Sequence, residues 1–223
     1  MTLDPDLHYL TCGYAQRTEP EYFVDDDSSG ITWQPDVYPE TLALARAHDR
    51  NVIIDLGCGR ARKLVTLHEQ HSDLELIGID FGPNIEWCRR YLRVGQWLEV
   101  DLETATSMPL EPRVIARSVV VCSDVLEHLI DPRPTIRLIC WLLGRGAARA
   151  VLSTPARNKR AGARHLGPPL NSSHVREWTQ GELRMFLASF PVEIERFELT
   201  RSDDSDGGLT TQLVVLKPPQ KHV

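Results

Sequence analysis

The chain has 223 residues, of which 42% are hydrophobic and 25% are charged, with a formal net charge of -6 at pH 7. This length suits one well-buried domain with a short extension, and the composition is ordinary for a globular protein. The acidic balance disfavours a general nucleic-acid-binding protein, which is usually basic. The five cysteines are scattered and form no Cys-x-x-Cys pair, which argues against a disulfide framework and a cysteine zinc site.

The N-terminal stretch, MTLDPDLHYLTCGY, contains neither the basic segment nor the apolar core of a signal peptide. No apolar run approaches the roughly 18 residues that a membrane-spanning helix needs. The cysteine usage fits a reducing compartment. We therefore expect a cytoplasmic protein that does not span a membrane.

Residues 1–38 show no clean helical or strand period, and we predict an N-terminal arm or cap there. We expect its aromatic side chains to pack against the core rather than to close over a ligand. These side chains are Tyr22, Phe23, Trp33 and Tyr38. Residues 39–217 are predicted to form a single domain, and residues 218–223 a tail.

Strands and helices alternate through this domain. The predicted elements in chain order are a helix at 39–50, a strand at 51–57, a helix at 61–71, a strand at 74–80, a helix at 83–93, strands at 96–102 and 114–124, a short helix ending at Asp131, a helix at 134–146, a strand at 147–155, a polar loop at 155–177, a helix at 178–190, and a hairpin of strands at 192–200 and 209–217. Thr179 and Glu182 have the spacing of a capping box at the start of the last helix.

Alternation at this spacing predicts an α/β fold with a parallel, doubly wound sheet and helices on both faces. Five strands followed by a C-terminal hairpin give a Rossmann-like, seven-stranded sheet that is mostly parallel, with an antiparallel hairpin strand. In such sheets, ligands bind at the carboxyl ends of the strands, near the point where the strand order reverses.

The first strand ends in a glycine turn, IIDLGCGRA, at residues 53–61. Gly57 and Gly59 allow a tight turn and a close approach of the backbone to a ligand. A dinucleotide-binding fingerprint requires a third glycine where this chain has Arg62. Asp80 ends the next strand, 21 residues after Gly59, where an acid can accept hydrogen bonds from ribose hydroxyls.

In order, IIDLGCGRA, GIDFG, VDLE and the apolar strand leading into CSDVLEH resemble class I S-adenosylmethionine (SAM) dependent methyltransferases. The resemblance covers roughly residues 50–155 and implies a SAM-binding site. It implies that Asp80 holds the ribose, that Asp101 and Leu102 lie beside the adenine, and that Ser123 lines the floor near the sulfonium. The full set of implied cofactor-binding residues is Asp55, Gly57, Cys58, Gly59, Asp80, Phe81, Asp101, Leu102 and Ser123. Ala61 departs from the family, which often has a third glycine there.

An acidic cluster with a histidine, SDVLEHLIDP, follows the fourth strand. On a helix, Asp124, Glu127 and His128 would share one face and could bind a divalent cation. The oxygen-rich ligand set favours Mg²⁺ or Mn²⁺ over zinc. The alternative is structural, with Asp124 and Glu127 forming an acidic capping box and His128 a half-buried histidine.

A later segment, HVREWT, places His174 in a loop that should overhang the same edge of the sheet. Together, DVLEH and HVREWT resemble the metal-site motifs of ubiquinone-pathway O-methyltransferases and of small-RNA 3′-terminal 2′-O-methyltransferases. This resemblance implies a cation site formed by Asp124, Glu127, His128 and His174, although those families have Glu where this chain has Asp124. His165, or His174 if it is not a ligand, is an alternative general base.

We therefore predict a SAM-dependent O-methyltransferase acting on a hydroxyl of a sugar, a glycan or a small natural product, assisted by Mg²⁺ or Mn²⁺. The alternatives are an RNA 3′-terminal 2′-O-methyltransferase and a non-catalytic SAM-fold binding subunit. The acidic balance makes a nucleic-acid partner the less favoured reading. The sequence leaves the acceptor and the oligomeric state open.

Overall fold

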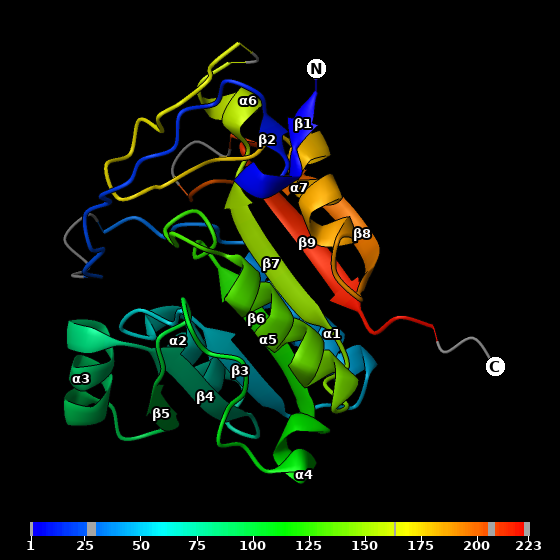
Figure 1. Cartoon of the computed structure of the whole chain (residues 1–223). Coiled ribbons are helices and arrows are strands. Elements are labelled where there is room, and N and C mark those ends of the chain that lie inside the picture. Colours follow the sequence, from blue (N-terminus) through cyan, green and yellow to red (C-terminus); the bar gives the residue numbers. More distant parts are fainter. Residues whose placement is uncertain (1, 26–29, 163, 205–207, 221–223) are drawn as a thin grey trace.

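The computed structural model describes residues 2–25, 30–162, 164–204 and 208–220. Parts of the predicted arm, polar loop, hairpin link and tail therefore lie outside the described residues. A central seven-stranded sheet carries helices on both faces, so the chain has three layers (Figure 1). The predicted α/β class with a Rossmann-like sheet is confirmed.

The sheet has the strand order β5-β4-β3-β6-β7-β9-β8. Its strands are β3 (Val52–Leu56), β4 (Glu75–Asp80), β5 (Gln96–Glu99), β6 (Ser118–Ser123), β7 (Ala150–Pro155), β8 (Glu193–Thr200) and β9 (Thr211–Lys217). The first five of these strands are parallel, whereas β9 pairs antiparallel with both β7 and β8. The strand order reverses between β3 and β6, so the carboxyl ends of these two strands flank the expected ligand position.

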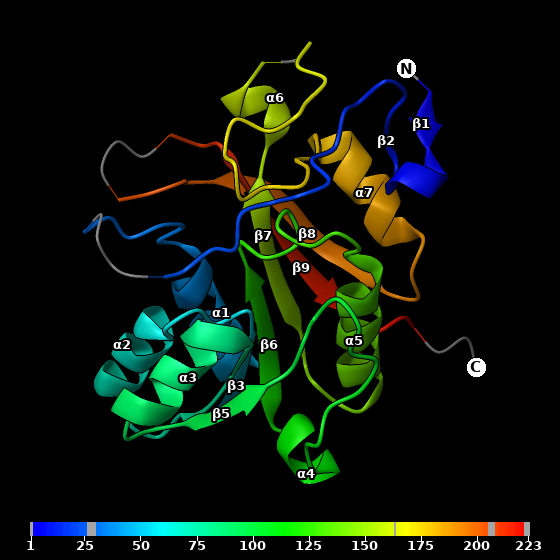
Figure 2. The same cartoon turned by 60° about the vertical axis from the view of Figure 1, so that its left-hand side comes forward.

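Two apolar cores lie on opposite faces of the sheet, each beneath one of the two layers of helices in Figure 2. One face is covered by α1 (Val37–Ala47), α2 (Arg62–Gln70) and α3 (Gly82–Tyr91), and the other by α4 (Pro112–Ile115), α5 (Arg133–Gly144) and α7 (Gln180–Ala188). Successive residues of a strand point to opposite faces, and accordingly Ile53 packs in the first core and Ile54 in the second. Among the described residues, no helix has both the length and the apolar character needed to cross a bilayer.

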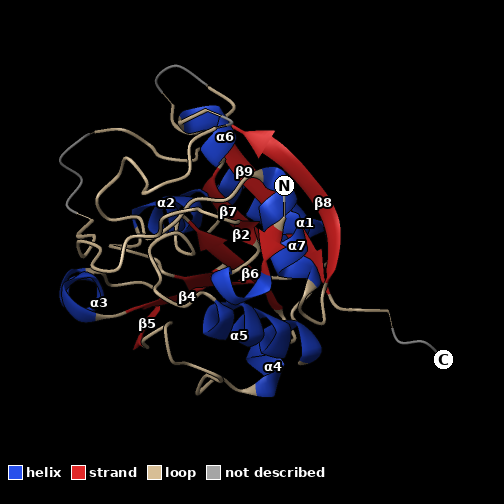
Figure 3. Cartoon of the chain, turned by 45° about the horizontal axis from the view of Figure 1, so that its top comes forward, coloured by secondary structure: helices blue, strands red, loops and turns tan. Residues whose placement is uncertain are grey.

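The N-terminal segment forms a small hairpin beside α7 (Figure 3). It consists of β1 (Leu3–Asp4), the 3-10 turn η1 (Pro5–Leu7) and β2 (Leu10–Thr11). The Thr11 hydroxyl donates to Glu182 Oε1 at 2.7 Å, and the indole N–H of Trp178 donates to the carbonyl of His8 at 3.0 Å. These contacts tie the start of the chain to a segment more than 160 residues away.

Two local predictions are wrong. The turn after β6 contains no helix, and the strand expected at 114–124 begins only at Ser118, because Val114 and Ile115 belong to α4 (Pro112–Ile115). The loop between β7 and α7 also contains a short helix, α6 (Arg157–Arg160), close to the carboxyl edge of the sheet. The capping box at the start of α7 is confirmed, because Thr179 and Glu182 each accept a backbone N–H of the other.

Glu182 also pairs with Arg157 at 2.6 Å, and both side chains are at least 97% buried. We predict that Glu182→Gln lowers the free energy of unfolding by about 3–5 kcal/mol, because it leaves the Arg157 charge buried without a carboxylate. Urea denaturation monitored by far-UV circular dichroism measures the change.

The control is Glu99→Gln, which removes the partner of Arg89 from an ion pair in which both side chains are nearly half exposed. Exposed ion pairs contribute about 0–1 kcal/mol, so this variant should remain close to the parent. Equal losses in the two variants would contradict a special role for the buried pair.

Candidate active site

A cavity of about 600 Å³ opens at the carboxyl ends of β3, β4, β5 and β6. Its walls include the glycine turn after β3, Asp80 and Phe81 after β4, Leu102 and Glu103 after β5, and Ser123 to Val125 after β6. Of the nine cofactor residues predicted from the sequence, seven line this cavity. They are Gly57, Cys58, Gly59, Asp80, Phe81, Leu102 and Ser123.

Glycine is required at position 57, both by the backbone conformation and by the lack of room for a side chain. Gly57 has φ 79°, and a Cβ at this position would lie 2.4 Å from a methyl group of Val125. Ala61, where the family often has glycine, also adopts the left-handed conformation, with φ 57°, just before α2 begins. The backbone therefore keeps the turn that a glycine would favour at this position.

Asp80 is held at the cavity wall by two backbone donors. Its carboxylate accepts the N–H of Gly59 at 2.8 Å and the N–H of Phe81 at 2.8 Å. Burial nevertheless raises the pKa of Asp80 to about 6. Each carboxylate oxygen retains a further lone pair, which suits it to accept hydrogen bonds from vicinal hydroxyls.

Asp55 and Asp101 do not line the cavity. Asp55 is fully buried beneath the glycine turn, where it accepts the hydroxyl of Tyr38 at 2.6 Å. Asp101 is exposed and accepts the N–H of Glu103 at 2.9 Å, which closes the turn after β5. Both acids therefore shape the loops around the cavity rather than face into it.

The acidic cluster lies on a non-helical turn. Asp124 has φ 59°, and no helix forms between β6 and α5, so the capping-box alternative is wrong. Glu127, His128 and His174 nevertheless converge, with one potential ligand atom from each lying within 4.8 Å of the others. The carboxyl of Asp124 lies outside this group of three and lines the cavity beside His128.

The two histidines are oriented by hydrogen bonds. The Nδ1–H of His128 donates to the carbonyl of Ser173 at 3.0 Å, and His174 Nδ1 contacts the carboxylate of Glu177 at 2.8 Å. In His128 this leaves the Nε2 lone pair available, as in metal-ligating histidines with an oriented second nitrogen. In His174 the side-chain amide nitrogen of Asn171 lies 3.0 Å from Nε2 and can donate to it. Burial lowers the pKa of His128 to about 4, so its ring is neutral at neutral pH.

Glu127 is fully buried, and its Oε2 accepts the hydroxyl of Thr154 at 2.9 Å. Its Oε1 has no hydrogen-bond partner among the described residues. Burial, with the nearby Asp124 carboxylate, raises the pKa of Glu127 well above its usual range, while contact with Glu127 and the neighbouring histidines lowers the pKa of Asp124. A buried carboxylate that converges with two imidazoles fits a divalent cation.

His165 lies apart from this group. Its Nδ1 accepts the N–H of Gly167 at 3.3 Å, within the loop that follows α6. It lines neither the cavity nor the group formed by Glu127, His128 and His174. The structure therefore brings two of the three predicted catalytic histidines together.

The arm supplies wall residues that sequence reasoning missed. Tyr22, Phe23 and Trp33 are 42–50% exposed and line the cavity, so the expectation that they pack in the core is wrong, whereas Tyr38 is buried. The Phe23 ring lies 5.7 Å from the ring of His128. Segments without a period carry no sequence signal for such contacts.

Gln34 and Lys63 were also missed. The side-chain oxygen of Gln34 accepts the hydroxyls of Ser123 and Ser153, which fixes the arm to the ends of β6 and β7. Lys63 lines the cavity, and its ammonium donates to the carbonyl of Trp33 at 3.1 Å. Both positions looked like ordinary polar residues of an arm and a helix.

Known proteins share this arrangement. Residues 54–148 match the model of a family described as a methyltransferase domain. A ubiquinone biosynthesis O-methyltransferase from Aeromonas salmonicida (strain A449) is 28% identical over 110 residues, which are 49% of this chain and 45% of that protein. The chain therefore matches less than half the length of this curated relative.

Solved structures agree on the fold. The methyltransferase domain of bacterial CtHen1 superposes with a TM-score of 0.59 at 17% identity, covering 82% of this chain and 98% of that one. An O-methyltransferase from neocarzinostatin biosynthesis, NcsB1, solved with SAM, gives a TM-score of 0.54 at 15% identity over 77% of this chain and 50% of its own.

The glycine turn, the acid after β4 and the seven-stranded sheet define a Rossmann-like, SAM-binding fold of the methyltransferase type. Together with the family match over residues 54–148, this arrangement agrees with that of class I SAM-dependent methyltransferases.

The buried Asp55 makes stability depend on pH. Burial raises the pKa of Asp55 to about 7, compared with about 3.9 in an unfolded chain. At a pH between these two pKa values, the Asp55 carboxyl is protonated in the folded state and ionised in the unfolded chain. The free energy of unfolding therefore falls as the pH rises through this range. We predict that Asp55→Asn reduces the fall in unfolding free energy between pH 5 and pH 8 by about 2–3 kcal/mol.

Urea denaturation of the ligand-free protein at the two pH values measures this difference. Asp101→Asn is the control, because that carboxyl is exposed at a neighbouring strand end. A parent and an Asp55→Asn variant with the same pH dependence would contradict the assignment of a protonated carboxyl beneath the glycine turn.

Proposed function

We propose that this protein is a SAM-dependent O-methyltransferase that methylates a hydroxyl of a sugar, a glycan or a small natural product with the help of a divalent cation. The observation that carries the proposal is the convergence of Glu127, His128 and His174 beside the cavity that carries the cofactor-binding signature. The cofactor supplies an activated methyl group, so the protein has to align an acceptor oxygen with it.

Residues around the cavity fit the parts of SAM. Asp80 would accept the ribose hydroxyls, and Phe81 and Leu102 would contact the adenine from the ends of β4 and β5. Gly57 and Gly59 would let the amino-acid part approach the backbone closely. Ser123, at the end of β6, would lie at the floor near the reacting carbon.

A carboxylate oxygen of Glu127 and ring nitrogens of His128 and His174 would hold the cation, Mg²⁺ or Mn²⁺. The side-chain amide of Asn171, 3.0 Å from His174 Nε2, would turn away if that nitrogen binds the cation. Three protein ligands leave coordination positions open for an acceptor. When bound, such a cation acts as a Lewis acid that lowers the pKa of a coordinated hydroxyl, which is otherwise a poor nucleophile at neutral pH. Thr154, Ser173 and Glu177 orient the three ligands through hydrogen bonds.

Asp124 has a different role in this proposal from the one its motif implies. Its carboxylate lines the cavity next to His128, outside the group of three, and its pKa is low enough to keep it ionised. There it can accept a hydrogen bond from the acceptor hydroxyl and receive its proton. His165 is not needed as a base, because it lies away from the cavity.

The aromatic side chains at the cavity mouth support the proposed acceptor class. Tyr22, Phe23 and Trp33 present exposed aromatic rings there, which suits them to contact the apolar face of a ring-shaped acceptor. A sugar or polyol with vicinal hydroxyls could bind the cation through both oxygens. The net charge of -6 weighs against RNA as the acceptor.

The cation site is tested with the metal-stripped protein carrying S-adenosylhomocysteine. We expect calorimetric titration with MnCl₂ to detect binding, and His174→Ala to weaken it by more than roughly tenfold, because one of three ligands is lost. The matched control is His165→Ala, which removes a histidine of the same loop outside the group and should leave the manganese affinity unchanged. A parent that does not bind manganese would refute the cation-assisted mechanism.

Methyl transfer from labelled SAM to a panel of sugars and polyols, with and without vicinal diols, tests the acceptor class. We expect product only with acceptors that carry a vicinal diol, and a loss of product in the presence of EDTA. Transfer to a short RNA with a free 3′ end, but to no sugar, would favour the RNA alternative. Failure of the parent to bind SAM would favour a non-catalytic binding subunit.

A further inference from the structure

We propose that Arg176 is a positioning residue for the cation site, because its guanidinium holds the turn that carries Glu127 and His128 against the segment that carries His174. This inference deepens the proposed function and rests on it for the cation, but not for the conformation of the turn. Arg176 is 1% exposed and does not line the cavity.

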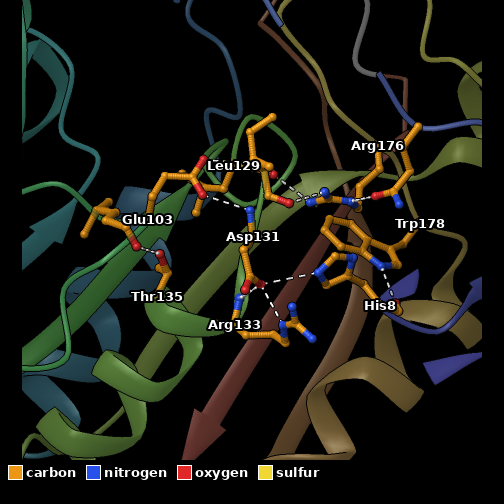
Figure 4. A network of polar contacts seen from close by, with 11 residues as sticks. His8, Glu103, Leu129, Asp131, Arg133, Thr135, Arg176 and Trp178 are labelled. Carbon is orange, nitrogen blue, oxygen red and sulfur yellow. Dashed lines mark hydrogen bonds and ion pairs between the residues drawn. The ribbon is translucent and has the colours of Figure 1, made fainter. Parts of the chain in front are cut away.

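The guanidinium of Arg176 donates hydrogen bonds to two carbonyl groups at the end of the turn. Its two terminal nitrogens donate to the carbonyls of Leu129 and Ile130, each at 2.7 Å, and Nε donates to the side-chain oxygen of Gln16 (Figure 4). Arginine is suited to this arrangement because its donors form a rigid planar fork, whereas a lysine offers one compact charge.

Residues next to Arg176 in the sequence also form hydrogen bonds with the turn after β6. The N–H of Val175 donates to the carbonyl of Glu127 at 2.7 Å, and the Nδ1–H of His128 donates to the carbonyl of Ser173 at 3.0 Å. The turn and the segment of His174 are therefore joined on both sides of that histidine. Arg176 adds the hydrogen bonds from its charged guanidinium to these backbone bonds.

Glu103 holds the turn from the opposite side. Its carboxylate accepts the N–H of Ile130 at 2.5 Å and the N–H of Asp131 at 2.8 Å. A helix through this stretch would require a bond from the N–H of Asp131 to the carbonyl of Glu127. The N–H of Asp131 is bonded to Glu103 instead, and the carbonyl of Glu127 is bonded to the N–H of Val175. The helical bond therefore cannot form, and the stretch remains a turn.

This conformation is what brings the ligand atoms together. In a helix, Glu127 and His128 would lie about 100° apart around the axis, with no constraint from His174. In the observed turn, the rings of His128 and His174 meet edge to face with centroids 4.7 Å apart. Without the fork of Arg176, the carbonyls of the buried Leu129 and of the exposed Ile130 lose their donors, and that end of the turn loses these two hydrogen bonds.

The test compares Arg176→Met and Arg176→Lys with the parent, using manganese affinity by calorimetry and amide hydrogen exchange. We expect Arg176→Met to weaken manganese binding by roughly tenfold or more, as for other residues that orient metal ligands. S-adenosylhomocysteine affinity should be preserved, because Arg176 does not reach the cavity. The lysine variant, which keeps the charge without the fork, should be intermediate and is informative if the methionine variant does not fold.

The matched control is Arg157→Met, which removes another buried arginine that contacts Glu182 and not the turn. We expect faster exchange of the amides of Ile130, Asp131 and Val175 in Arg176→Met but not in Arg157→Met. Unchanged manganese affinity in Arg176→Met, or an equal loss in Arg157→Met, would overturn the inference. If the parent does not bind manganese, the cation part of the proposed function fails, and hydrogen exchange alone decides whether Arg176 holds the turn.

Discussion

The site depends on the burial of one carboxyl group, that of Glu127. Removing a carboxylate from water is costly unless hydrogen bonds or charges compensate for it. Thr154 supplies one hydrogen bond, Oε1 has no hydrogen-bond partner among the described residues, and the carboxylate lies beside His128 and His174, so the site is completed either by a proton or by a cation. The backbone carbonyl of the same residue joins the turn to Val175, so the position of Glu127 links β6, β7 and the segment of His174.

Features with a local period could be predicted from the sequence. The apolar runs of β3, β4 and β6 and the helices α2 and α3 follow from spacing alone, and the glycine turn and Asp80 lie where a parallel sheet puts its ligands. The capping box of Thr179 and Glu182 was equally predictable, because its partners are three residues apart. The additional bonds of Glu182 to Thr11 and Arg157 join distant segments and have no local signal.

The turn after β6 shows how tertiary contacts override a local preference. The sequence DVLEH has acids at the spacing of a helix start, and nothing within it predicts a turn. The backbone groups directly after it, at residues 129–131, are instead bonded by Glu103 and Arg176, which lie 24 residues before and 49 residues after Glu127 in the sequence. The sequence therefore indicated which residues are candidate ligands, but it did not predict the backbone conformation that brings them together.

The arm adds a further constraint, because one short segment contacts both halves of the site. Asn84 donates to the carbonyl of Phe23 at 3.2 Å, and Asp25 accepts the N–H of Arg60 at 3.1 Å, beside the glycine turn. The ring of Phe23 lies against His128 at the other end of the same segment. Residues 22–25 thus form a shared wall of the cofactor and cation regions, and any displacement of this wall by one ligand changes the space that is left for the other.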